Sequence, residues 1–171
     1  MEDAGTRAAV AEDTLFSGIT LLDQRGETVS SAELRGKSVG LLFCDGSSPV
    51  CLSILPFLIQ FYNSVNCGGL IKKIEIVYVS CDETRETFER NILRMPWLHL
   101  DFDDTVRPIL RHRYNVMAVD TAYGSFSSME IPSIVVVDNR GGEVQRFPLY
   151  HGREESNQVL KRWDWRNSAF A

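Results

Sequence analysis

Residues 38–65 read SVGLLFCDGSSPVCLSILPFLIQFYNSV, and this stretch decides the fold. Its first part, Val39 to Phe43, is almost continuously apolar, which is typical of a strand covered on both faces. Beyond a polar turn, a helical pattern runs from about Pro49 to Val65. Its apolar positions are Cys51, Ile54, Leu55, Leu58, Tyr62 and Val65. A buried strand that leads into an amphipathic helix predicts the first half of a β-α-β crossover.

The rest of the chain continues this alternation of strands and helices. Two further apolar runs, Ile74 to Ser80 and Ser133 to Asp138, predict central strands, and Glu143 to Phe147 predicts a short antiparallel strand. Helical patterns cover Thr84 to Arg94, Asp104 to Tyr114 and Glu154 to Trp163, and a hairpin over residues 18–29 precedes the first strand. We therefore predict an α/β fold in which a mixed sheet of four or five strands follows an N-terminal hairpin and carries helices on both faces.

Length, charge and cysteine content limit the class of protein. With 171 residues the chain suits one domain, which we expect over residues 15–171 after a flexible tail at 1–14. The net charge of -5 argues against binding nucleic acid through its phosphates, and no apolar run is long enough to span a membrane. Four cysteines without C-x-x-C spacing and three scattered histidines predict neither a disulfide scaffold nor a metal site. We expect free thiols, a cytoplasmic location and no cofactor.

Several short segments resemble the tryparedoxin/nucleoredoxin branch of the thioredoxin superfamily, in family order from about residue 15 to residue 165. They are Leu34-Arg35-Gly36-Lys37-Ser38-Val39, Leu41-Leu42-Phe43, the aromatic stretch from Phe57 to Tyr62, Val79-Ser80-Cys81-Asp82-Glu83, Met95-Pro96-Trp97-Leu98 and Ile131-Pro132-Ser133. The resemblance implies a thioredoxin-like fold, protein-disulfide reductase activity and a kinetoplastid source. In that family a strand ends in a WCPPC motif, whose first cysteine is the nucleophile and whose second cysteine resolves the mixed disulfide.

That motif is degenerate in this chain, where Ser47-Ser48-Pro49-Val50-Cys51 occupies its place. Ser47 takes the tryptophan position, Ser48 replaces the nucleophile, and Cys51 keeps the resolving position. A serine hydroxyl cannot exchange disulfides, so Ser48 is best explained as a helix N-cap before Pro49. Two interpretations of Cys51 stay open. The helix N-terminus would stabilise its thiolate, whereas its place at the head of the apolar stripe favours a buried structural thiol.

Two other cysteines are candidate auxiliary thiols. Cys44 ends the first strand, and Cys81 ends the neighbouring parallel strand at the same edge of the sheet. A Cys44–Cys51 pair or a Cys44–Cys81 pair would need Cα atoms within about 7 Å. Packing in the core is the default interpretation for both residues.

The resemblance also implies a face of the protein that binds the substrate. It places Ile131 and a cis Pro132 beside the motif, where backbone groups pair with an extended substrate peptide. An insertion of about a dozen residues, 117–130, precedes them. Its Tyr123 and Phe126 are candidate substrate-binding residues, either as an exposed contact surface or as a plug for the space that the lost tryptophan leaves.

Two functional hypotheses follow, both within thiol redox homeostasis. In the first, the dithiol cycle is lost and the chain binds a protein or extended peptide at the Pro132 face. In the second, a residual thiol-disulfide oxidoreductase uses Cys51 alone or together with Cys44 or Cys81. A weaker third hypothesis is a structural subunit of a larger redox assembly. The resemblance implies a trypanothione or thioredoxin-type thiol system as the redox partner.

Overall fold

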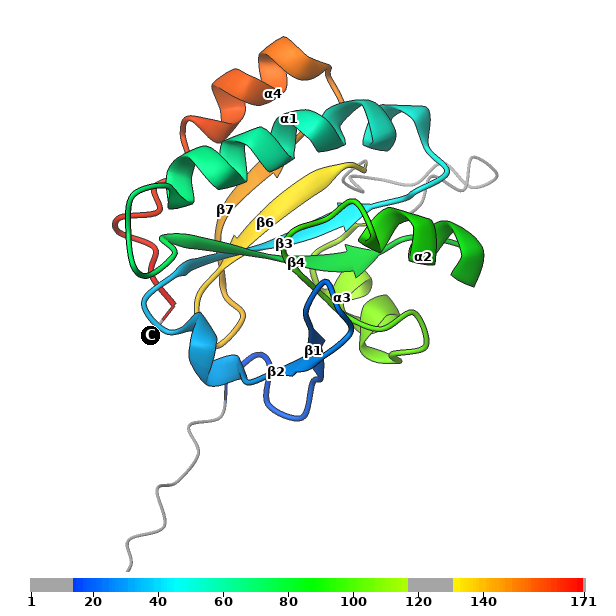
Figure 1. Ribbon diagram of the computed structural model, residues 1–171, viewed down its shortest axis with the longest axis horizontal. Helices are drawn as coiled ribbons and strands as arrows, with labels where there is room; N and C mark the ends of the chain where they lie inside the picture. The colour runs from blue at the N-terminus through cyan, green and yellow to red at the C-terminus, as the bar shows by residue number, and fades with distance from the viewer. Residues whose placement is uncertain (1–13, 117–130, 171) are drawn as a thin grey trace, which may run out of the picture.

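A seven-stranded mixed sheet forms the centre of the computed structural model, which describes residues 14–116 and 131–170. The strands are β1 (Leu21–Leu22), β2 (Thr28–Val29), β3 (Ser38–Cys44), β4 (Ile74–Ser80), β5 (Leu98–His99), β6 (Ser133–Val137) and β7 (Glu143–Pro148), in the spatial order β2-β1-β5-β4-β3-β6-β7. The helices are the 3-10 helix η1 (Ser31–Leu34) and the α-helices α1 (Pro49–Asn66), α2 (Arg85–Ile92), α3 (Val106–Arg113) and α4 (Arg153–Leu160). In Figure 1, α1 and α4 lie together over one face of this sheet.

The pairing of the central strands brings three chain segments to one edge of the sheet. Strands β3 and β4 are parallel, with Cys44 opposite Ser80, because α1 crosses over the sheet between them. Strand β6 runs antiparallel to β3, with Phe43 opposite Ser133. The ends of β3 and β4 and the start of β6 therefore meet at the same edge.

Two apolar cores cover the two faces of the sheet. The first packs α1, α2 and α4 against alternate residues of β3 and β4 and contains Leu42, Tyr78 and Trp163. The second packs α3 and the N-terminal hairpin against the other face and contains Leu41, Val79 and Leu110. Both sets of strand side chains are buried, which explains why β3 and β4 are apolar without alternation.

The predicted α/β class, the mixed sheet, the N-terminal hairpin and the helices on both faces are confirmed. One strand was not predicted: β5 has only two residues, too few to show a period, yet it joins the hairpin to β4. Residues 1–13 and 117–130 lie outside the described residues, so the tail, the insertion and the domain boundaries stay predictions. No helix within the described ranges is both long enough and apolar enough to cross a membrane.

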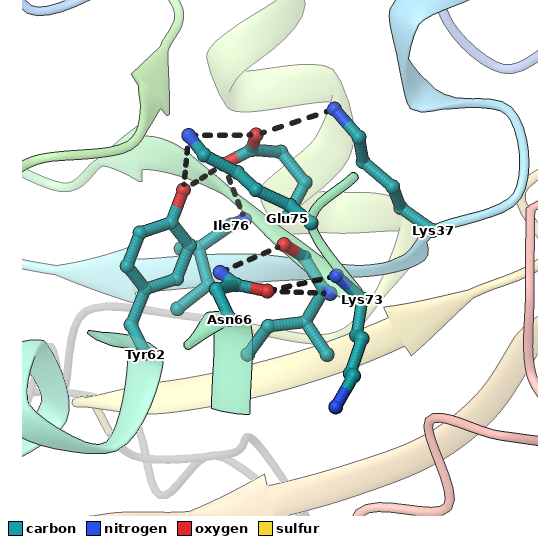
Figure 2. Close-up of polar contacts among 8 residues, drawn as sticks. Lys37, Tyr62, Asn66, Lys73, Glu75 and Ile76 are labelled. Carbon is teal, nitrogen blue, oxygen red and sulfur yellow. Dashed lines mark hydrogen bonds and ion pairs between the residues drawn. The ribbon is translucent and has the colours of Figure 1, made fainter. Parts of the chain in front are cut away.

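A buried carboxylate, Glu75, anchors the start of β4, at the edge of the sheet opposite to Cys44 and Cys51. Figure 2 shows Glu75 between Tyr62 and Lys37, with the Tyr62 hydroxyl donating to Glu75 Oε1 at 2.8 Å. The Lys72 ammonium lies 3.8 Å from Glu75 Oε2 and donates to the Tyr62 oxygen at 2.9 Å. Burial and the Glu75 charge raise the pKa of Tyr62, so this hydroxyl keeps its proton and remains a donor. Asn66 ties the end of α1 to the same strand by accepting the backbone N–H of Lys73 at 2.9 Å.

Removing the Tyr62 hydroxyl should destabilise the fold, because Glu75 would lose its strongest side-chain donor inside the protein. We expect Tyr62→Phe to lower the free energy of unfolding by about 1–2 kcal/mol, measured by urea denaturation. Tyr150→Phe is the matched control, since no hydrogen bond involves its hydroxyl within the described residues. Equal losses in the two variants would show that the network adds no stability.

Candidate functional site

The loop between β3 and α1 carries Ser47 and Ser48, where the sequence predicts a degenerate motif, and local hydrogen bonds fix its conformation. Asp45 Oδ1 accepts both the backbone N–H and the hydroxyl of Ser47, each at 2.8 Å. Ser48 is the N-cap of α1: its backbone is extended and its Oγ accepts the Cys51 N–H at 3.5 Å. Pro49 follows at the first helical position, where its missing N–H costs nothing. The Ser48 position is thus built as a helix cap.

Cys44 and Cys51 lie together beneath this loop. Both thiols are free and buried, with side chains 2% and 1% exposed. The Asp45 N–H donates to Cys51 Sγ at 3.3 Å. A hydrogen bond from the Cys44 thiol lowers the pKa of Cys51, and the Asp45 N–H and Ser48 lower it further, against the effect of burial. The same contact and burial raise the pKa of Cys44. Cys51 is therefore the more acidic thiol of the pair, and it lies in a place that solvent does not reach.

The other two cysteines are separated from this pair. Cys81 donates its backbone N–H to the Cys44 carbonyl at 2.9 Å, but its side chain packs in the opposite core, on the α3 face. The backbones of Cys44 and Cys81 are thus adjacent, whereas their side chains belong to different cores, and their role as auxiliary thiols stays a prediction. Burial raises the pKa of Cys81 to about 12, so its thiol stays protonated near neutrality. Cys67 is exposed at the far end of α1.

A second buried carboxylate, Asp82, organises the edge of the sheet around the motif. Its Oδ1 accepts the Gly46 N–H at 2.6 Å, and its Oδ2 accepts the hydroxyls of Tyr78 and Ser80. Asn91 on α2 donates to the Tyr78 oxygen at 2.8 Å. Gly46 has no room for a side chain, since a Cβ would lie 2.9 Å from Asp82 Oδ1. Sequence reasoning did not single out this network as part of the site, because it joins three separate segments: the loop after β3, the end of β4 and α2.

The predicted substrate-binding residues Ile131 and Pro132 lie at the same edge of the sheet as Cys44 and Asp82. Pro132 is buried and Ile131 is half-buried, and the peptide bond between them is cis. The Pro132 carbonyl accepts the Leu149 N–H at 2.9 Å, which ties this segment to the end of β7. Tyr123 and Phe126 lie outside the described residues, and their predicted role stays a prediction. No group of three His, Cys, Asp or Glu side chains that could hold a metal ion occurs in the described part of the chain.

Comparison with known proteins gives the family. A family described as thioredoxin-like matches residues 36–144. Tryparedoxin of Trypanosoma brucei brucei is 32% identical over 124 residues, which cover 72% of this chain and 76% of that protein. The chain belongs to the thioredoxin-like family. Mouse nucleoredoxin is 29% identical over 147 residues, 85% of this chain and 30% of nucleoredoxin. Among solved structures, tryparedoxin II of C. fasciculata matches with a TM-score of 0.65 and 24% identity, covering 85% of each chain.

These matches confirm the resemblance to tryparedoxin and nucleoredoxin and the thioredoxin-like fold. The chain spans only 26% to 30% of the length of the animal nucleoredoxins that it matches. Relatives occur in animals, plants and kinetoplastids, so a kinetoplastid source stays a prediction. In this chain the predicted nucleophile position holds Ser48, a helix cap, and Cys44 and Cys51 are buried beneath it.

Alkylation of the native protein should separate the four thiols by exposure rather than by pKa. We expect iodoacetamide to label Cys67 at least about tenfold faster than Cys44, Cys51 or Cys81, because reaction needs access as well as a thiolate. Peptide mass mapping over time measures the four rates, and a urea-unfolded sample should label all four. Rapid native labelling of Cys51, as fast as that of Cys67, would contradict its burial.

Proposed function

We propose that this chain is a thioredoxin-fold protein of thiol redox homeostasis that binds a protein or extended peptide partner without a dithiol cycle. The observation that carries the proposal is Ser48, which caps α1 at the position that resembles the family's nucleophile. Exchange needs a thiolate there, and a serine hydroxyl is protonated near neutrality unless a base activates it. No histidine forms a hydrogen bond with Ser48 in residues 14–116 and 131–170.

The binding face that we propose lies around the first turn of α1 and the start of β6. Val50 presents an apolar side chain there, 41% exposed, beside the exposed Ser47 and Pro49. Ile131 and Pro132 reach the same edge of the sheet through the pairing of β6 with β3. An extended peptide could pair with backbone groups at such an edge without any thiol. The partner's thiol system, of trypanothione or thioredoxin type, and a cytoplasmic location are parts of this proposal.

Selection of peptides tests the binding face directly. We expect a phage-displayed library of random heptapeptides to yield clones that bind the immobilised protein and lose most of that binding to Val50→Asp. The aspartate would place a charge at the centre of the proposed apolar contact. Val144→Asp is the matched control, because Val144 is 46% exposed on β7 and lies outside the proposed face. No enriched clones, or equal losses in both variants, would overturn the proposal.

A second candidate function rests on the contact between Cys44 and Cys51. In this scheme the Cys51 thiolate attacks a substrate disulfide and forms a mixed disulfide, and one substrate sulfur leaves as a thiol. Cys44 then attacks Cys51 Sγ, so that the second substrate sulfur leaves reduced and an intramolecular disulfide remains. The lowered pKa of Cys51 favours the first step. Its burial opposes that step, and for this reason we place the redox function second.

Restoring the missing thiol separates the two functions. Ser48→Cys would place a half-buried thiol at the N-terminus of α1, three residues before Cys51, where the helix lowers the pKa of a thiol. We expect this variant to reduce insulin disulfides, with dithiothreitol as reductant, at least about tenfold faster than the native chain.

The double variant Ser48→Cys, Cys51→Ala is the control and should stop at a mixed disulfide. Turnover by the native chain that disappears in Cys51→Ala would instead establish the second function. A Ser48→Cys variant without added turnover would show that other changes at the site have also disabled it.

A further inference from the structure

A hollow of about 320 Å³ opens beside the degenerate motif, between the loop after β3 and the C-terminal half of α2. Its lining residues are Gly46, Ser47, Leu52, Arg90, Asn91 and Arg94, and we call it the Arg90–Arg94 hollow. Ser47 takes the position at which the family resemblance expects a tryptophan. The small serine side chain leaves space beside Leu52 that an indole ring would occupy.

The hollow is positively charged on its solvent side. Arg90 and Arg94 are exposed, and neither forms an ion pair with any residue in the described ranges. The carboxylates of Asp45 and Asp82 already accept hydrogen bonds from this loop, Asp45 from Ser47 and Asp82 from Gly46. The N-terminus of the 18-residue α1 adds a partial positive charge at the same place. Arg90 and Arg94 therefore keep guanidinium donors that an anionic group could bind.

Asn91 supplies a second, independent sign of a ligand. Its side chain lines the hollow, is 2% exposed, and leaves its Oδ1 without a hydrogen-bond partner in the described structure. The amide orientation follows from the neighbours of Tyr78. The Tyr78 hydroxyl faces two acceptors, the Asp82 carboxylate and the Cys44 carbonyl, so it gives its one proton there and accepts from Asn91 Nδ2. The unpartnered atom is thus an acceptor, which suits a backbone N–H.

We propose that the Arg90–Arg94 hollow binds an acidic peptide segment. A glutamate or aspartate carboxylate lies between the two guanidinium groups, and an adjacent apolar side chain covers Leu52. The Asn91 side chain shifts so that its Oδ1, buried in the free chain, accepts a backbone N–H of the segment. This inference rests on the proposed function, since it names the chemistry of the partner that the same edge of the sheet would hold. It requires no thiol, so binding does not depend on Cys51.

A pair of synthetic peptides tests this proposal. The probe is a capped heptapeptide with glutamates on both sides of a central leucine, and its twin carries glutamines instead. We expect saturable NMR shifts of the Asn91 side-chain amide with the acidic peptide, and binding at least about tenfold weaker for the twin. Added sodium chloride should weaken binding of the acidic peptide. Equal affinity for both peptides, or no shifts at Asn91, would overturn the inference.

Variants of the full chain complete the test. The double variant Arg90→Ala, Arg94→Ala should weaken binding at least about tenfold, whereas Arg25→Ala, Arg153→Ala removes as much exposed charge elsewhere and should leave binding unchanged. Ser47→Trp should fill the hollow and abolish binding, with circular dichroism as the check of folding. Library-selected peptides without acidic residues that bind at Val50 would leave the proposed function intact while the acidic inference fails. Loss of binding in the control variant would also overturn the inference.

Discussion

The buried carboxylate of Asp82 is the constraint on which the functional edge of the sheet depends. It accepts hydrogen bonds from the loop after β3, through the Gly46 N–H, and from Tyr78 and Ser80 within β4. A carboxylate in this position must keep such donors, because its desolvation is otherwise uncompensated. The loop therefore cannot move away from β4 without exposing a buried charge. Since the loop leads directly into α1, Asp82 also fixes where Ser48, Cys51 and the hollow lie.

Strand β4 carries a buried carboxylate near each end, and each one accepts a tyrosine hydroxyl. Tyr62 donates to Glu75 at the start of the strand, and Tyr78 donates to Asp82 just beyond its end. The surroundings differ in charge. Two lysine ammoniums lie within 4.0 Å of Glu75, whereas the donors to Asp82 are neutral N–H and O–H groups. The first end is thus an ionic cluster whose charges compensate one another. The second end holds a loop in place beside Arg90 and Arg94, which form no ion pair with the residues that the structure describes.

Local patterns made much of this architecture predictable from the sequence. The unbroken apolar runs of β3 and β4, the helical stripe of α1 and the Ser48-Pro49 cap each depend on neighbours within a few residues. The directions of the Cys44 and Cys81 side chains, by contrast, depend on how distant segments pair in the sheet. Cys44 and Cys81 point into opposite cores because the register places Cys44 opposite Ser80, and successive side chains alternate between faces. The Asp82 network and the Arg90–Arg94 hollow likewise need contacts between residues tens of positions apart, which no periodicity reveals.

Serine at position 48 is better suited to capping α1 than to thiol chemistry at this edge of the sheet. Serine is among the most favourable N-cap residues, and a good cap stabilises a helix by about 1 kcal/mol relative to alanine. A thiol is a weak acceptor, so a nucleophilic cysteine at this position would hold the first turn of α1 less firmly. A serine here provides no thiol three residues before Cys51, and Cys51 itself is buried in the core beside Cys44. Under the proposed function, a stable cap and the absence of a thiol at this position are two consequences of one side chain.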